Sequence, residues 1–511
     1  MRCAGLLIVL VASAAAVPAP RSASALAPIA QKEAGLDALA KRLKDANERE
    51  RRGAVQELAK LASHAAWELV FDALKDASPM VADEAQLQLA KLDGAESEAL
   101  LSGKRGFASG DAVVRARIAE AVGRMNAFHD LDALAAAVLD KEADVRRLAI
   151  WSAERIARRG TERSSDSAGL LQQTLARLSM KDSEPGVRAA AAIGFGAFVT
   201  DAAKLAEASW LEDKAAAVRC AALIDALTRS APVRFAAASR LAADPDFAVR
   251  AQAIETLASC GSKQAAALLV DRLEKESNLR VRWRIVHALQ ALSGSDLELN
   301  PAYWRKWVEG LDDTWKPATG ERKAPREVKE QGTTVFLGLP VLSERVAVLV
   351  DFSGSLWEKR ADGKTRKEAA DEELAKFLKQ LPPAAKFNVI PYTGRPFPWE
   401  KQVVPATKEN VARALAAFAK CKETGKGNVW DAIELALRDP EVDTLLVLTD
   451  GAPTGGPHWN LELMESLLHE KLRFRKIAID AVLVDAGKFL QDRWRAICEG
   501  TGGRMHSVEM R

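Results

Sequence analysis

A Val-Arg dipeptide recurs in the N-terminal part of this 511-residue chain at intervals close to 31 residues. The series opens with Val81, which lacks the Arg, and successive valines are 33, 31, 42, 31, 31 and 32 residues apart. This period constrains the fold strongly, because a unit of this length cannot bury its apolar face alone and must stack on its neighbours. The dipeptides are Val114-Arg115, Val145-Arg146, Val187-Arg188, Val218-Arg219, Val249-Arg250 and Val281-Arg282.

The residues around each of these valines predict a helix. Apolar residues follow the Val at spacings of four and eight, which is one face of a helix. The residues four later are Ala85, Ile118, Ala149, Ala191, Ala222, Ala253 and Ile285. An acid five residues before the Val suits the positive end of a helix dipole, and only Val114, preceded by Ser109, departs from this rule. The acids are Asp76, Asp140, Asp182, Asp213, Asp244 and Glu276.

Residues 28–295 resemble an array of short HEAT-like repeats, in which the acid-x4-Val-Arg pattern is typical. The resemblance implies an α-solenoid of helical pairs whose extended curved surface usually binds another protein. Two alternatives for the array are that it acts as a bilin lyase or that it only spaces the C-terminal domain from an anchor. Nothing in the sequence favours the lyase. A degenerate unit is expected near 52–55. The 42-residue step predicts an inserted loop over 158–169.

Residues 1–27 are typical of a secretory signal peptide, with Arg2 ahead of an apolar run and small residues after it. Cleavage is expected after Ala23-Ser24-Ala25 or after Ala12-Ser13-Ala14. A cytoplasmic helix is the alternative. We therefore expect a secreted, periplasmic or cell-envelope protein.

Four cysteines remain beyond that segment, with spacings that match no zinc motif. Export would permit a disulfide between Cys421 and Cys498, and four buried small apolar side chains are the alternative. The formal charge of +3 gives no reason to expect nucleic acid as a partner. Residues 296–333 predict a Trp-containing helix over 300–309 that caps the last repeat, and then a polar linker.

A second fold begins with the apolar run Val346 to Val350, which predicts a strand buried on both faces of a parallel sheet. It ends in Asp351, Ser353 and Ser355, and a second buried run, 444–449, ends in Asp450. Ligands bind at the carboxyl ends of such strands, and hard oxygens are what Mg²⁺ prefers. The alternative for the first cluster is a helix cap.

Residues 334–511 resemble a von Willebrand factor type A (VWA) domain. Asp351-x-Ser353-x-Ser355 is similar to the family's metal-ion-dependent adhesion site, and Thr449-Asp450-Gly451 to its second acidic loop. The resemblance implies an α/β, doubly wound, mostly parallel, Rossmann-like sheet, and Mg²⁺ (or Mn²⁺ or Ca²⁺) as cofactor. In the family the serines and a threonine from a third loop bind the metal, and the acids act largely through water.

The third loop departs from the family pattern. Gly427 stands where the family has its threonine, and Thr424 is the candidate substitute three residues upstream. The predicted metal residues are therefore Asp351, Ser353, Ser355, Asp450 and Thr424. Trp357, His458 and Trp459 could rim a ligand site or pack inside the domain.

The sequence shows no catalytic constellation, so we expect a binding protein and not an enzyme. In the VWA family the metal accepts an acidic residue from another protein, which implies a protein partner and no nucleic acid or small-molecule substrate. Two alternatives are an accessory subunit that presents substrates to an ATPase or metal-inserting complex, and a structural envelope protein with a non-functional metal site. The Trp-containing helix and the lead-in at 336–340 resemble exported bacterial VWA proteins.

Overall fold

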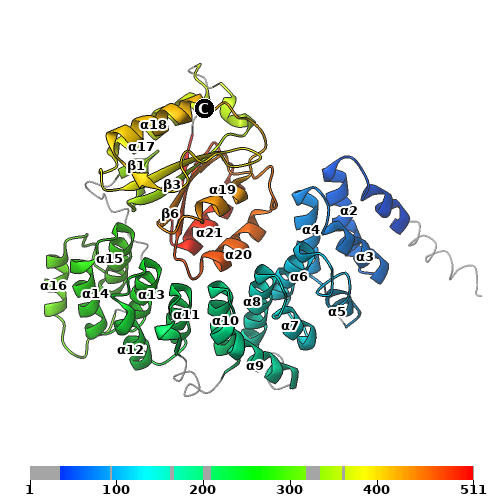
Figure 1. Cartoon of the computed structure of the whole chain (residues 1–511), viewed down its shortest axis with the longest axis horizontal. Helices are drawn as coiled ribbons and strands as arrows, with labels where there is room; N and C mark the ends of the chain where they lie inside the picture. The colour runs from blue at the N-terminus through cyan, green and yellow to red at the C-terminus, as the bar shows by residue number, and fades with distance from the viewer. Residues whose placement is uncertain are drawn as a thin grey trace, which may run out of the picture.

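The computed structural model of the chain describes residues 35–92, 95–160, 166–199, 209–317, 334–359 and 363–509. Paired helices stack into an arc, and a sheet flanked by helices follows (Figure 1). Both parts of the predicted fold class, the α-solenoid and the mostly parallel α/β domain, are confirmed. The expected signal peptide at 1–27 and most of the expected linker lie outside the described residues.

The helices of the repeat array alternate between the two sides of the arc. Their bounds are α2 Glu48–Leu61, α3 His64–Ala73, α4 Pro79–Leu89, α5 Ala95–Ser102, α6 Ala112–Arg124, α7 Leu131–Ala137, α8 Ala143–Arg159, α9 Asp166–Lys181, α10 Pro185–Phe198, η2 Ser209–Glu212, α11 Ala216–Ala226, α12 Ala231–Leu241, α13 Phe247–Ala258, α14 Lys263–Lys275, α15 Leu279–Ser293 and α16 Pro301–Glu309. Each repeat valine is buried within a helix, as its spacing predicts.

An ion-pair ladder joins successive repeats. In the five repeats from Val114 to Val249, the Arg after the repeat Val bonds the acid at the start of the next repeat, as Arg219 does with Asp244 at 2.7 Å from both Nε and Nη2. The Asp244 oxygen that accepts from Arg219 Nη2 also accepts the backbone N–H of Asp246. The carboxylate therefore also caps a turn. The other rungs are Arg51–Asp76, Arg115–Asp140, Arg146–Asp182, Arg188–Asp213 and Arg250–Glu276.

This ladder explains the two departures from the repeat pattern. Ala82 stands where the Arg would follow Val81, and Ser109 stands where the next acid would be. The Arg of one repeat pairs with the acid of the next. Ala82 and Ser109 therefore stand at one and the same junction between repeats, and this junction lacks both members of its ion pair. Arg51, at the ladder position in α2, shows that a further unit precedes Val81.

Removing one half of a rung should leave a charge without its partner. Arg219→Met is expected to lower the free energy of unfolding by about 2 kcal/mol, since the Asp244 side chain is only 5% exposed. Urea unfolding of Arg219→Met, Asp244→Asn and the double variant measures the coupling between them. A double variant as unstable as the sum of both single variants would show that the rung contributes nothing.

The expected loop over 158–169 is wrong at both of its ends. Arg158 and Arg159 complete α8, and α9 starts at Asp166, so only a short connection separates two long helices. Arg159 donates to the carbonyls of Gly123 and Met125 at the end of the preceding inner helix. These bonds extend α8 beyond the point at which sequence pattern alone would end it.

The C-terminal domain is one doubly wound sheet with a small hairpin. Its elements are β1 Thr334–Phe336, β2 Leu339–Val341, β3 Arg345–Asp351, η3 Gly354–Trp357, α17 Arg366–Gln380, β4 Lys386–Tyr392, β5 Val404–Pro405, α18 Lys408–Lys420, α19 Val429–Ala436, β6 Thr444–Thr449, α20 Leu461–Leu472, β7 Ala478–Val484, α21 Lys488–Thr501 and β8 Met505–Val508. The strand order is β5-β4-β3-β6-β7-β8, parallel except for β5.

The two faces of this sheet belong to different cores. Val346, Val348 and Val350 face α17 and α18 in a core of their own. Ala347 and Leu349 face α19, α20 and α21, in a cluster continuous with the interior of the array. This alternation follows from the two-residue period of a strand, and it explains why β3 is apolar throughout.

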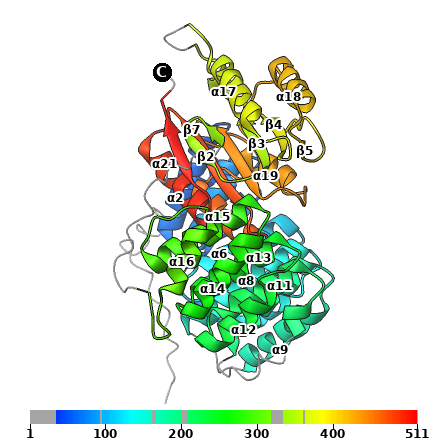
Figure 2. The same cartoon turned by 90° about the vertical axis from the view of Figure 1, so that its left-hand side faces the viewer.

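The sheet domain lies inside the curve of the array. Figure 1 shows α20 and α21 directed toward the inner side of the arc, with α17 and α18 on the far side, and Figure 2 shows the same layering from the side. The extended curved surface that we expected to bind another protein is thus largely covered by the chain's own second domain.

The Trp-containing helix, the cysteines and the possible membrane segments were also considered in the sequence, and the structure describes each of them as follows. Trp304 of α16 is fully buried against the array, and its ring meets Trp307 edge-on. All four cysteines of the described part are free, with Cys220 and Cys498 buried. Throughout the described residues, no helix is both long and apolar enough to pass through a bilayer.

Candidate metal centre

Asp351 ends β3 beneath the carboxyl edge of the sheet and is 6% exposed. Its Oδ1 accepts the backbone N–H of Ser353 at 2.9 Å, and its Oδ2 accepts the Thr449 hydroxyl at 2.9 Å. The parallel register of β3 with β6 delivers Thr449 and Asp450 to the same edge. The two acids predicted from separate strands therefore come together, as the sheet topology requires.

Burial, together with the neighbouring charge of Asp450, raises the pKa of Asp351 to about 6. Asp351, Thr449 and Asp450 line one side of a small, mostly apolar cavity of about 20 Å³, which is room for about one water molecule. Arg366 also lines it, but its guanidinium already pairs with Asp485 and Glu358, at 2.9 Å each.

The predicted hydroxyl residues are placed differently from one another. Ser353 is buried and donates to Asp351 from its backbone and its hydroxyl. Ser355 lies in η3, with its side chain outside the described part. Thr424 is exposed, directly before Gly425, which bridges to Ser353.

Gly427 lies directly against the acidic cluster. A Cβ built on it would lie 3.1 Å from both oxygens of Asp351, so the third loop approaches the site where the family pattern puts a threonine. The Gly427 N–H donates to the Thr454 hydroxyl at 2.6 Å, and its carbonyl accepts the Thr454 N–H at 3.0 Å. Sequence reasoning missed Thr454, a hydroxyl next to the position that Gly427 leaves bare.

These residues fit a divalent cation with fewer hydroxyl ligands than the family pattern provides. Within the described chain, no three His, Cys, Asp or Glu side chains gather as a metal site. A cation here would therefore depend on Asp351 and Asp450 together with hydroxyls and water, which is the oxygen chemistry that Mg²⁺ accepts. The burial of Asp351 beside Asp450 favours a cation here, because a cation would stabilise the carboxylate charge that burial, and then the charge of Asp450, disfavour.

The candidate rim residues are occupied by packing. Trp357 meets Phe352 edge-on at 6.2 Å. His458 meets Trp430 at 4.4 Å and lies 3.4 Å from the carboxylate of Asp83, a residue of the array. Trp459 lies under the guanidinium of Arg52 at 4.7 Å. The structure therefore favours packing over a ligand-site rim for these three residues.

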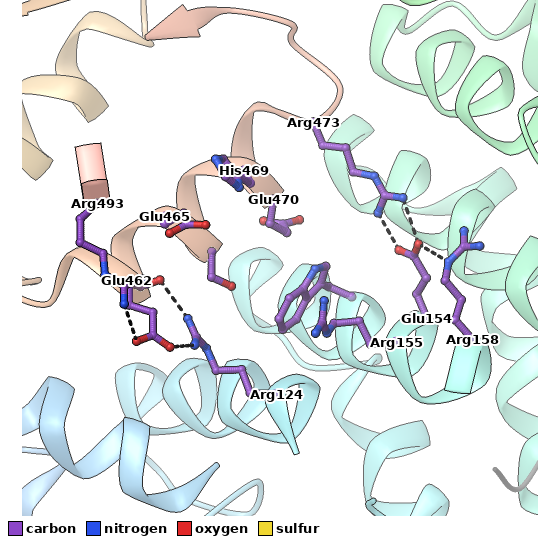
Figure 3. A pocket seen from close by; sticks show the side chains of 12 residues that line it. Arg124, Glu154, Arg155, Arg158, Glu462, Glu465, His469, Glu470, Arg473 and Arg493 are labelled. Atoms are coloured by element: carbon purple, nitrogen blue, oxygen red, sulfur yellow. Dashed lines mark hydrogen bonds and ion pairs between the residues drawn. The ribbon is translucent and has the colours of Figure 1, made fainter. Parts of the chain in front are cut away.

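Charged side chains line part of the contact between the two domains (Figure 3). Arg473, directly after α20, donates two bonds to Glu154 of α8, at 2.6 and 2.9 Å, and Arg124 pairs with Glu462 at 3.1 Å. Between these pairs lies a cleft of about 730 Å³. Further along the array, the contacts are Arg147–Glu470, Lys476–Glu255, Arg280–Asp480 and Asn278–Asp443.

The comparisons with known proteins agree with this architecture. A family description, HEAT repeats, matches residues 235–300. Over 130 residues the chain is 33% identical to inter-alpha-trypsin inhibitor heavy chain 4 of Mus musculus, covering 23% of this chain and 13% of that protein. It is 23% identical over 163 residues to von Willebrand factor A domain-containing protein 3B of Homo sapiens, covering 32% and 12%.

Among solved structures, the chain is similar to a von Willebrand factor type A protein from Catenulispora acidiphila. The identity is 19% and the TM-score 0.27, over 33% of this chain and 39% of that one. By these comparisons the chain is similar to HEAT-repeat proteins and to proteins with a VWA domain. It spans only 13% and 12% of the length of the two curated relatives.

Proposed function

We propose that this chain is a protein-binding protein whose VWA-type domain uses a divalent cation to accept an acidic residue of a partner. The observation that carries the proposal is the buried Asp351 carboxylate beside Asp450 at the open edge of the sheet. Relatives named for VWA domains support a binding role.

Asp351, Asp450, Ser353 and Ser355 would hold the cation, with Thr454 or Thr424 as a further hydroxyl. A bound cation would supply an open coordination position for a carboxylate oxygen from another chain. Asp351 would take part mainly through water, because both of its oxygens already accept hydrogen bonds within the domain.

Thermal unfolding of the full chain with Mg²⁺ or Mn²⁺, beside Asp351→Ala, tests this proposal. Metal at about 100 times its dissociation constant should add roughly 2.7 kcal/mol to the free energy of unfolding, and Asp351→Ala should abolish the gain. Ca²⁺ in the same assay ranks the cations. If no metal stabilises the wild-type chain, the metal-dependent mechanism is wrong.

Gly427→Thr is expected to strengthen Mg²⁺ binding about tenfold, which is about 1.4 kcal/mol. The variant adds a hydroxyl next to Asp351 on a backbone that has no positive φ at this position. Gly427→Ala adds the same crowded Cβ without the hydroxyl and is the matched control. Titration of both variants with Mg²⁺ gives the comparison, and equal affinities would show that the threonine position is not a ligand position in this chain.

We also propose export, a bacterial origin and action by binding. Export to the periplasm, cell envelope or exterior is supported by the pattern of residues 1–27, and Edman sequencing of the native protein tests it by locating its N-terminus. A bacterial origin is supported by the Trp-containing helix and the lead-in at 336–340. Action by binding and not by catalysis is supported by the scattered positions of the six His residues.

A further inference from the structure

Asp83 of α4 is a fully buried carboxylate at the contact between the two domains, with an exposure of 0%. It accepts the backbone N–H groups of Trp459 and Asn460, at 2.6 and 2.9 Å, where α20 begins. Within the array it pairs with Arg117 at 2.8 Å. An anion from the array thus lies at the positive end of a helix of the other domain.

The surroundings of Asp83 favour its charged form. Burial alone would raise its pKa, but His458 and Arg117 outweigh that effect and lower the pKa below its ordinary value. Arg117 also donates to the carbonyl of Pro457 at 3.2 Å. The end of the loop that leads from Asp450 to α20 is therefore fixed by two residues of the array.

The middle of the same loop is fixed to the third loop of the metal edge. Thr454 and Gly455 donate to the Gly427 carbonyl, at 3.0 and 3.2 Å. Gly456 has a φ of +89°, and a Cβ there would lie 2.0 Å from Asn428 Oδ1, so only glycine allows this approach. A continuous set of contacts therefore runs from Asp83 through residues 454–460 to Gly427 and on to Asp351.

We propose that Asp83 is a positioning residue of the metal edge, so that the repeat array completes the binding site of the other domain. This inference rests on the proposed function. Asp83 fixes the start of α20, and α20 fixes the loop that carries Asp450 at its other end. Without this anchor, the loop must be ordered when the cation binds, which weakens affinity.

Calorimetric titration of the full chain with Mn²⁺ tests the inference. Asp83→Asn keeps the shape of the side chain but removes the charge, and it should raise the dissociation constant for Mn²⁺ about tenfold or more. Glu255→Gln is the matched control, because Glu255 is an array carboxylate that pairs with Lys476 of the other domain. No contact joins that pair to the metal loops among the described residues, so this variant should change the constant by less than about twofold.

The outcomes separate the inference from the proposed function. If the wild-type chain binds no Mn²⁺, the proposed function fails. If the wild-type and Asp83→Asn chains bind equally well, or if both variants weaken binding alike, Asp83 has only a structural role. Thermal unfolding of each variant accompanies the titration, and Asp83→Glu, with a milder expected loss of about threefold, replaces Asp83→Asn if that variant does not fold.

Discussion

Replacing Arg280 by methionine is expected to lower the free energy of unfolding by about 3–5 kcal/mol. Arg280 is 3% exposed, and it donates to Asp480 Oδ2 at 2.8 Å and to the Thr444 hydroxyl at 2.9 and 3.1 Å. Asp480 is fully buried in β7, so the variant leaves a carboxylate with no cation in a dry environment. Methionine preserves much of the side-chain volume, which confines the effect to the lost charge.

Two variants control this prediction. Arg280→Met with Asp480→Asn removes both charges and should recover a large part of the loss, because the remaining amide can still bond the Arg504 N–H that Asp480 accepts at 2.8 Å. Arg305→Met breaks a pair that is about one third exposed and should change stability by less than about 1 kcal/mol. Chemical denaturation measures all three, and a loss below about 1 kcal/mol for Arg280→Met would contradict a buried ionic contact between the domains.

Stability is expected to fall by about 2 kcal/mol between pH 7.5 and pH 5 because of one histidine, His287 of α15. Burial, then the charges of Arg504, Arg280 and Arg284, lower the pKa of His287 from 6.5 to about 4. Its ring lies 5.8 Å from that of Trp283. The folded chain therefore keeps His287 neutral at pH values at which the unfolded chain is protonated.

The sign follows from proton uptake. The stability that neutral His287 allows is complete above pH 6.5, is lost as the pH falls from 6.5 to 4, and changes no further below 4. The carboxylates with lowered pKa, among them Asp83, Glu154 and Glu255, lose their contribution at more acid pH. Urea unfolding at several pH values should therefore show a flatter profile between pH 7.5 and 5 for His287→Gln. Parallel profiles would refute the assignment.

The repeat array was predictable from sequence because its period and its apolar face are local features. The pattern located the acid and the Arg of each repeat, but their pairing joins residues about one repeat apart. For this reason the missing Arg at Ala82 and the missing acid at Ser109 appeared as two irregularities, although they belong to one junction. Only the stacking of one repeat on the next brings these two positions together, and the sequence of a single repeat does not show it.

The docking of the domains was not predictable, because its residues look like ordinary charged helix surface in the sequence. Asp83 and Arg147 are two residues after a repeat Val, and Arg117 and Arg284 are three after. Side chains at these positions point to the inner side of the arc. Charged residues that recur there indicate that the inner side contacts another charged surface. Sequence carries no information on which surface that is.

At the metal edge, sequence order predicted that Asp351 and Asp450 would meet, because parallel strands share an edge. Thr454 was missed because it enters from a loop whose course depends on Asp83 of the other domain. Gly427 was recognised as a departure, and the structure adds how near its backbone comes to Asp351.

Mn²⁺ binding to the full chain, followed by the electron paramagnetic resonance signal of the free ion, is the direct test of a cation at this edge. We expect one site per chain in the wild-type protein and loss of that site in both Asp351→Ala and Asp450→Ala. A wild-type chain that leaves all the Mn²⁺ free, or a site that survives both substitutions, would contradict a cation-dependent binding edge on this domain.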